Sequence, residues 1–460
     1  MKRRNFGLLA GTSLAASAVR PVWGQSVAPD PSLLTTTLTP VGAERVGNAD
    51  GSIPAWTGGL VSPPLPPDQP VAVRIFADEK PLYTVDASNM AQYAGMLNEG
   101  TKAQMTKFGL KINVFPTHRT AAAPQYVYDN IAKNVTRAKL DPRGGRLGFT
   151  GAYGGIPFPI IDKTDPLVGG VQVIWNHLIA WPGNSAVGTF NPGVVMMDGQ
   201  LILVAGTKSY YTYPYYDPNG SPETYEGYYS KGHFFDLAPG AVKGQETLVW
   251  HSSNVSLNPD IVWTLLNGQG RVRKAPNEQY DSPNPESNGI ASVDEASGFY
   301  GNPSQYDWSL VGKQEMLIPY NCNEMLFHSV QEDLRPHFPN PEIVRWEKHR
   351  CWVVEANLHP GQHNVNSKRR FYMDEDTWAI VVGEGYDANG SLVKAYTNYL
   401  NCTPSLPGTT EQCTATYSLI SGNYVFNGNM SYPPFVGKSY IQPIAPSMFE
   451  PQEMAANASF

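Results

Sequence analysis

From about residue 143 to 442 the chain alternates short apolar runs with turn sequences, a pattern that predicts β-strands. The clearest part spans 350–400, where turns separate four runs and apolar and polar residues alternate from Trp352 to Leu358. Glycine-containing turns also predict hairpins at 194–204 and 262–275. Long strands joined by tight turns predict a broad antiparallel sheet.

Helical periodicity is concentrated in residues 86–140. Asp86 or Ser88 can cap a helix in which apolar residues from 90 to 97 recur at intervals of three and four. Pro124 can begin a second helix, whose apolar residues fall on one stripe: Val127, Ile131 and Val135. We therefore expect a mainly β (α+β) fold in which a few helices pack on the sheet.

These patterns divide the chain into four parts. Residues 1–24 have the features of an export signal, and residues 25–85 form an extended arm rich in Pro and Gly. Residues 86–442 form the folded domain with its helices at 86–140, and residues 443–460 form a C-terminal tail.

The composition narrows the class of protein. Only 16% of the 460 residues are charged, whereas 43 Gly, 40 Pro and 11% aromatic residues favour strands and turns over a helical bundle. The net charge of −7 argues against a general nucleic-acid-binding protein. Beyond the N-terminus no run of apolar residues is long enough to span a bilayer.

The N-terminus resembles a signal for the twin-arginine export route. Arg3 and Arg4 precede a modestly apolar run, and Val22 and Gly24 are small residues placed for cleavage before Gln25. An ordinary secretory signal with two arginines is the alternative. No cysteine precedes Cys322, so we expect a periplasmic protein that is not a lipoprotein.

An exported chain with four cysteines is expected to pair them. Cys402 and Cys413 are close in sequence, which favours a local disulfide, and Cys322 would then pair with Cys351. Four cysteines allow three connectivities, so this pairing is one of three.

Sequence motifs of enzymes are largely missing. The chain has no nucleophile elbow, zinc-protease helix motif, phosphate-binding loop or dinucleotide fingerprint, so we assign no catalytic residue, metal site or cofactor. If the protein is an enzyme, it needs a perturbed acid or base in the cavity, for which His177 or Glu355 is the candidate.

Aromatic residues are the candidates for ligand binding. Between Tyr210 and Tyr229 the chain has eight tyrosines, whose rings could line a surface for an apolar ligand. Tyrosine also simply favours strands, which is the alternative explanation. We expect six residues to line the concave face of the sheet: Trp175, Tyr211, Tyr213, Trp263, Trp352 and Trp378.

Several long motifs resemble a large uncharacterised family of exported Gram-negative proteins. The motifs are Val41–Gly59, Gly154–Pro159, Val173–Leu178, Arg271–Asn277 and Tyr372–Trp378. That family is described as similar to the lipoprotein-sorting carriers LolA and LolB. The resemblance implies an antiparallel sheet curled into an unclosed barrel around helices, with an apolar cavity. It also implies partners such as an inner-membrane transporter or an outer-membrane protein, and transient contact with a membrane.

These observations lead to three hypotheses. The first is a periplasmic carrier or chaperone for a lipid, a lipoprotein acyl chain or a sterol-like compound. The second is a periplasmic hydrolase or isomerase of a hydrophobic substrate. The third is an accessory protein that docks on an envelope transporter through the Pro-rich stretch at 62–70.

Overall fold

The computed structural model describes residues 29–63, 73–190, 192–204, 206–238, 240, 242–275, 281–284, 287–428 and 444–457. The predicted export signal and residues 64–70 of the Pro-rich stretch lie outside this part of the chain. No helix of the described part is long and apolar enough to cross a lipid bilayer.

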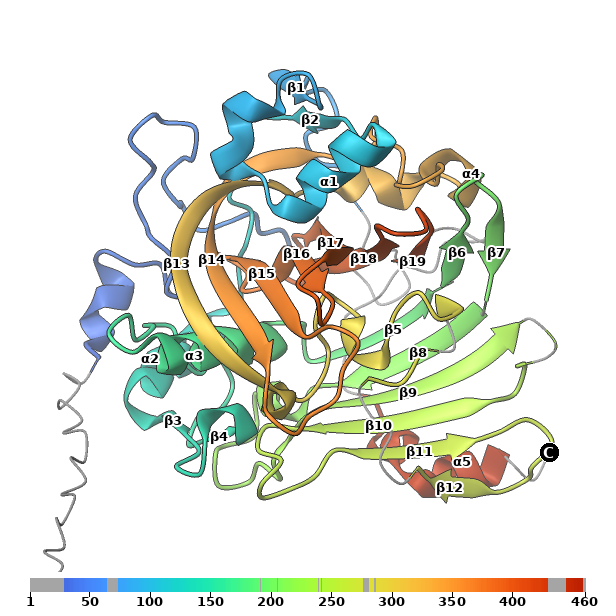
Figure 1. Cartoon of the computed structure of the whole chain (residues 1–460). Coiled ribbons are helices and arrows are strands. Elements are labelled where there is room, and N and C mark those ends of the chain that lie inside the picture. Colours follow the sequence, from blue (N-terminus) through green and yellow to red (C-terminus); the bar gives the residue numbers. More distant parts are fainter. Residues whose placement is uncertain are drawn as a thin grey trace, which may run out of the picture.

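Most described strands belong to one large sheet (Figure 1). Its order is β1-β2-β14-β15-β16-β17-β18-β19-β6-β7, with β13 also paired to β14. Every pairing is antiparallel except a single parallel contact between β14 and β2. The strands are β1 (Tyr83–Val85), β2 (Ile112–Val114), β6 (Gly193–Val195), β7 (Leu201–Leu203), β13 (Tyr306–Pro319), β14 (Trp346–Leu358), β15 (Lys368–Asp374), β16 (Ile380–Tyr386), β17 (Leu392–Thr403), β18 (Gly408–Ser418) and β19 (Tyr424–Gly428).

The two end strands of this sheet, β1 and β7, are not paired with each other, so the sheet stays open. Figure 1 shows β13 and β14 bending strongly around the helices beside them. The predicted fold class, a mainly β fold with a large unclosed sheet and few helices, is confirmed. The predicted hairpin at 194–204 and the four strands between 350 and 400 are also confirmed.

Both faces of the large sheet are buried. Because successive side chains of a strand point to opposite faces, Trp352 and Val354 pack on one side while Val353 packs on the other. The first face meets α2 (Gln125–Arg137) and α3 (Pro166–Leu178), and the second meets α1 (Glu99–Phe108). The sheet is therefore the middle layer between two sets of helices.

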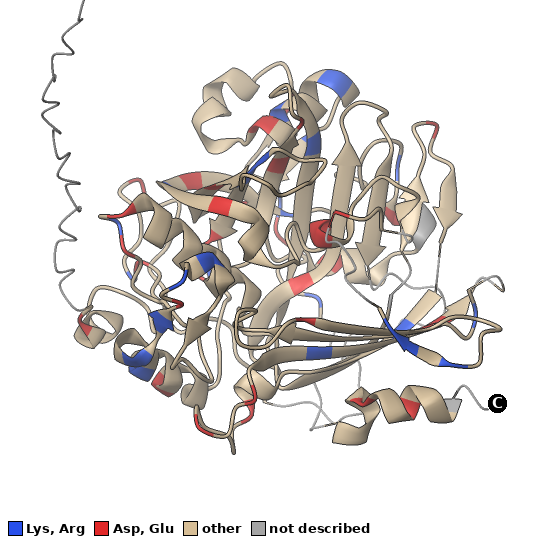
Figure 2. Cartoon of the chain, turned by 60° about the horizontal axis from the view of Figure 1, so that its bottom comes forward, with Lys and Arg blue, Asp and Glu red and all other residues tan. Residues whose placement is uncertain are grey.

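A second, six-stranded antiparallel sheet lies beside the first, whereas the sequence pattern predicted a single sheet. Its order is β12-β11-β10-β9-β8-β5. Phe449 and the C-terminal helix α5 (Pro451–Asn457) pack against one of its faces, as Figure 2 shows. The strands are β5 (Ser185–Phe190), β8 (Gly206–Thr212), β9 (Tyr228–Ala238), β10 (Glu246–Ser252), β11 (Ile261–Leu265) and β12 (Val272–Lys274), the last two forming the predicted hairpin.

The helices match the sequence prediction only in part. Helix α2 forms as predicted after Pro124 and buries its apolar stripe. The first predicted helix is instead a 3₁₀ helix, Met90–Met96, that precedes α1. Helix α3 was not predicted, and Gly170 lets it approach β13 so closely that a Cβ atom would lie 2.7 Å from the Ser309 nitrogen. The remaining short elements are α4 (Val330–Asp333) and the pair β3 (Lys139–Leu140) and β4 (Phe149–Thr150).

The described part of the N-terminal arm lies along the folded domain. Trp56 donates its indole N–H to the Ala121 carbonyl oxygen at 3.1 Å, and Leu60 donates its N–H to the Thr120 oxygen at 2.9 Å. At its end, residues 83–85 become strand β1 of the large sheet. The arm is thus fixed to the domain by backbone hydrogen bonds.

The prediction that the cysteines pair is wrong in this structure, because none of the four forms a disulfide and all four are buried. Cys402 and Cys413 lie on neighbouring strands but in different register, opposite Thr409 and Tyr399 respectively. Burial raises the pKa of Cys402 to about 11, so its thiol is protonated at neutral pH.

Candidate functional site

A cavity of about 190 Å³ lies where the two sheets meet. Its walls come from the end of α3, from β8 and β9 of the smaller sheet, and from the β17–β18 hairpin of the larger one. Aromatic rings dominate the lining, which includes Trp181, Tyr211, Tyr213, Tyr215, Tyr216, Tyr229 and Tyr300. Among the described residues that line it, none is Lys or Arg.

Local strand geometry places the tyrosines in the cavity. Tyr211 and Tyr213 are two residues apart, so they face the same side, and their rings stack with centroids 6.1 Å apart. Tyr229 lies at a register shift between β9 and β10, where Ser230 and Tyr228 pair with successive residues of β10 and Tyr229 is the extra residue. A bulge of this kind re-aims a side chain, which accounts for Tyr229 and Ser230 both lining the cavity.

The floor of the cavity is rigid and its rim is more open. Tyr215 and Tyr216 are buried and donate their hydroxyl protons to the carbonyl oxygens of Gly155 and Ile179. Trp181, Tyr211 and Tyr213 are only half-buried. An apolar molecule can therefore reach a fixed aromatic floor past these three rings.

His177 lines the cavity, but both of its ring nitrogens are already used. Nδ1 accepts the N–H of Ile380 at 3.1 Å, and Nε2 lies 3.1 Å from the Phe299 carbonyl oxygen, to which it donates. Burial lowers the pKa of His177. The ring is thus neutral and held by backbone groups, an arrangement that serves packing rather than proton transfer.

Glu355, the other candidate acid or base, lies on β14 and is not among the described residues that line the cavity. It forms ion pairs with Lys368 at 3.0 Å and Arg370 at 2.6 Å. Burial opposes ionisation, but these two cations hold the pKa of Glu355 below its usual range. His177 and Glu355 therefore do not lie in the same site: His177 lines the cavity and Glu355 does not.

The six predicted ligand-binding residues occupy three places. Tyr211 and Tyr213 line the cavity. Trp175, Trp352 and Trp378 are buried in the core between the large sheet, α2 and α3, where Trp352 and Trp378 stack with their planes 8° apart. Trp263 lies on the smaller sheet and packs edge-to-face on Trp250, next to the C-terminal segment. A ligand-binding role for these four tryptophans stays a prediction.

Most lining residues were not predicted, and three of them, Trp181, Tyr300 and Glu411, bear on ligand binding. Trp181 follows the unpredicted helix α3 and donates its indole N–H to the Pro407 oxygen at 2.8 Å. Tyr300 and Glu411 come from a loop and from β18. The tyrosine-rich stretch up to Tyr229 was the only sequence signal that pointed to this cavity.

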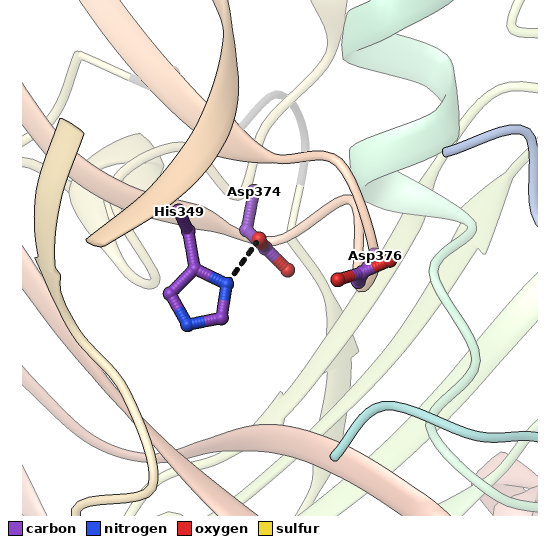
Figure 3. A group of neighbouring side chains, drawn as sticks. All are labelled: His349, Asp374 and Asp376. Carbon is purple, nitrogen blue, oxygen red and sulfur yellow. Dashed lines mark ion pairs between the residues drawn. The ribbon is translucent and has the colours of Figure 1, made fainter. Parts of the chain in front are cut away.

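A second candidate site is a buried cluster of His349, Asp374 and Asp376 (Figure 3). One possible ligand atom from each lies within 4.8 Å of the others, so the group could hold a metal ion. However, the Arg119 guanidinium binds both oxygens of Asp376, each at 2.7 Å. Nε2 of His349 lies 3.1 Å from Glu347.

These contacts favour a network of ion pairs over a metal centre. Glu375, next to Asp376, pairs with Arg350 and Lys313, each at 2.7 Å. Burial raises the pKa of Asp374 to about 7. Burial alone would lower the pKa of His349, but the hydrogen bond with Glu347 and the charge of Asp374 raise it. Nδ1 of His349 lies 3.6 Å from Oδ1 of Asp374, so a protonated His349 and an ionised Asp374 stabilise each other inside the core.

Comparison with known proteins identifies the family. An uncharacterised protein of Pseudomonas aeruginosa is 35% identical over 395 residues, which cover 84% of this chain and 83% of the relative. A crystal structure of a DUF1329-family protein from Desulfovibrio piger matches 63% of this chain and 100% of its own, with 14% identity and a TM-score of 0.42. A putative outer-membrane lipoprotein-sorting protein domain from Vibrio parahaemolyticus matches 62% of this chain and 98% of its own, with 11% identity and a TM-score of 0.43.

The model of the family DUF1329, described as proteins of unknown function, matches residues 84–455. The match confirms the resemblance that the sequence motifs indicated. The chain therefore belongs to the DUF1329 family.

Proposed function

We propose that the protein is a periplasmic carrier that binds a hydrophobic molecule in the cavity between its two sheets. The observation that carries this proposal is the aromatic lining of the cavity, whose rim is half-buried and whose floor is fixed by hydrogen bonds. Transfer of each CH₂ group from water into such a site contributes about 0.8 kcal/mol, so an apolar ligand can be held without covalent chemistry.

Release of such a ligand requires a competing surface. A membrane, an inner-membrane transporter or an outer-membrane protein can supply it, and each is a partner expected of an exported carrier. The N-terminal export signal expected from the sequence places the protein in the compartment where these partners meet.

The proposal is tested by titration with a neutral fluorescent probe, N-phenyl-1-naphthylamine. Tyr211 lines the cavity, whereas its neighbour Tyr210 packs with the cluster on the opposite face of the same sheet. Tyr211→Ala is expected to weaken probe binding about tenfold, and the matched variant Tyr210→Ala is expected to leave it unchanged. Equal binding by both variants, or no binding by the wild type, would reject the carrier hypothesis.

A further inference from the structure

Glu411 is the one acidic side chain among the described residues that line the cavity. It lies on β18 opposite Leu400, beside a register shift between β17 and β18. Glu411 is half-buried and lines the same cavity as His177 and Tyr300, whose pKa values its negative charge acts to raise.

In the described part of the chain no Lys, Arg or His lies within ion-pair distance of Glu411. Several buried acidic residues elsewhere have a cationic partner, such as Glu295 with Lys394 and Glu347 with Arg345, each at 2.5 Å. His177 cannot neutralise Glu411 while its ring is held neutral by backbone groups. The cavity therefore carries one negative charge that the fold leaves uncompensated.

The rings around this carboxylate favour the same type of ligand. Tyr211, Tyr213 and Trp181 lie on the half-buried side of the cavity, and the faces of such rings attract cations. Because Lys and Arg are absent among the described lining residues, no cationic side chain of the lining attracts an anion. A carboxylate and several aromatic rings around one space are the groups that recognise an ammonium ion.

We propose that the ligand of this cavity is a cationic amphiphile, with an amine or quaternary ammonium group against Glu411 and an apolar chain over the tyrosines. This inference rests on the proposed carrier function and names the chemical class of its cargo. A fatty acid would place a second negative charge beside Glu411. A neutral alcohol would gain a hydrogen bond but no charge attraction.

The test compares three ligands of equal chain length, dodecylamine, dodecanol and dodecanoate, at pH 7 and below their micelle-forming concentrations. Displacement of N-phenyl-1-naphthylamine reports the affinity of each. The wild type is expected to bind the amine about tenfold more tightly than the alcohol, and the carboxylate most weakly. High salt is expected to reduce the preference for the amine.

Glu411→Gln should bring the ratio of amine to alcohol affinity close to one. Glu342→Gln removes the same charge from an exposed position and should keep the wild-type ratio. Equal or tighter binding of the carboxylate by the wild type would overturn the inference, and so would an unchanged ratio in Glu411→Gln. If the wild type binds none of the three ligands, the carrier function itself fails. If Glu411→Gln does not fold, the wild type alone tests the inference. Tighter binding of the amine than of the alcohol and the carboxylate, weakened by high salt, would support it, and any other ranking would overturn it.

Discussion

The indole N–H of Trp181 donates a hydrogen bond to the carbonyl oxygen of Pro407 at 2.8 Å. Trp181 belongs to the loop between α3 and β5, and Pro407 to the turn between β17 and β18. The bond therefore ties the smaller sheet to the larger one at the rim of the cavity, because Trp181 also lines that rim. Its ring packs edge-to-face on Tyr216 with centroids 4.9 Å apart.

Trp181→Phe keeps an aromatic ring but removes the bond to Pro407. We expect a loss of about 1 kcal/mol in unfolding free energy, with severalfold weaker binding of N-phenyl-1-naphthylamine. Trp56→Phe removes a comparable indole hydrogen bond, to Ala121, outside the cavity and should leave probe binding unchanged. Equal effects of the two variants on binding would argue against a role of Trp181 at the rim.

Arg119 tests whether the cluster around Asp376 is an ion-pair network. Its side chain is 2% exposed, so Arg119→Met leaves a buried carboxylate without its partner and is expected to destabilise the fold by about 3–5 kcal/mol. Arg74→Met breaks the exposed pair with Glu324 and should cost at most about 1 kcal/mol. Thermal unfolding in the presence of EDTA measures the loss of stability in both variants without interference from bound metal. A similar small effect of both substitutions would contradict the network.

Glu384 makes the stability of the fold depend on pH. Burial raises its pKa from 4.5 to about 7, although Oε1 accepts the N–H of Glu99 at the start of α1 at 2.6 Å. Because the folded-state pKa is raised, the stability contributed by the protonated acid is complete below pH 4.5 and is lost as pH rises through about 7. The shift corresponds to about 3 kcal/mol at pH 8.

Glu384→Gln cannot ionise and should therefore melt at a higher temperature than the wild type at pH 8, but not at pH 5. The exposed variant Glu342→Gln should follow the wild type at both pH values. If Glu384→Gln and the wild type show the same change in melting temperature between pH 5 and 8, then the ionisation of Glu384 does not govern stability in this range.

The absence of disulfides among the four cysteines gives a direct chemical prediction. Unfolding in denaturant and alkylation without any reductant should add four labels to the chain, one for each buried thiol. A reductant should also leave the melting temperature of the folded protein unchanged. Fewer than four labels would show that a disulfide forms despite the register of β17 and β18.

The sequence predicted those elements whose patterns are local. Alternation of apolar and polar residues from Trp352 to Leu358 is enough to locate β14, because successive side chains of a strand point to opposite faces, even though the fold buries both faces here. Helix α3 was not predicted because its own sequence is apolar on most sides and contains two glycines. It therefore shows no amphipathic stripe. The cavity could be predicted only through its tyrosines. Glu411, His177 and Tyr300 come from β18, from α3 and from a loop, and no spacing along the chain indicates that these three elements meet.

The cysteines also show that spacing along the chain does not predict contacts in the fold. The separation of Cys402 and Cys413 along the chain fits a disulfide, but the register of β17 and β18 places each opposite another residue. Register depends on the whole hairpin and its turn rather than on the two residues alone.

The central claim, that the cavity holds a hydrophobic ligand, is tested most directly by native mass spectrometry of the protein purified from the periplasm. The matched variants are Ala296→Trp, which fills the cavity, and Ala388→Trp, which adds the same ring at an exposed turn. We predict a bound mass that organic solvent removes from the wild type and from Ala388→Trp, and that is lost from folded Ala296→Trp. The same bound mass on both variants, or an unloaded wild type after incubation with membranes, would contradict the account.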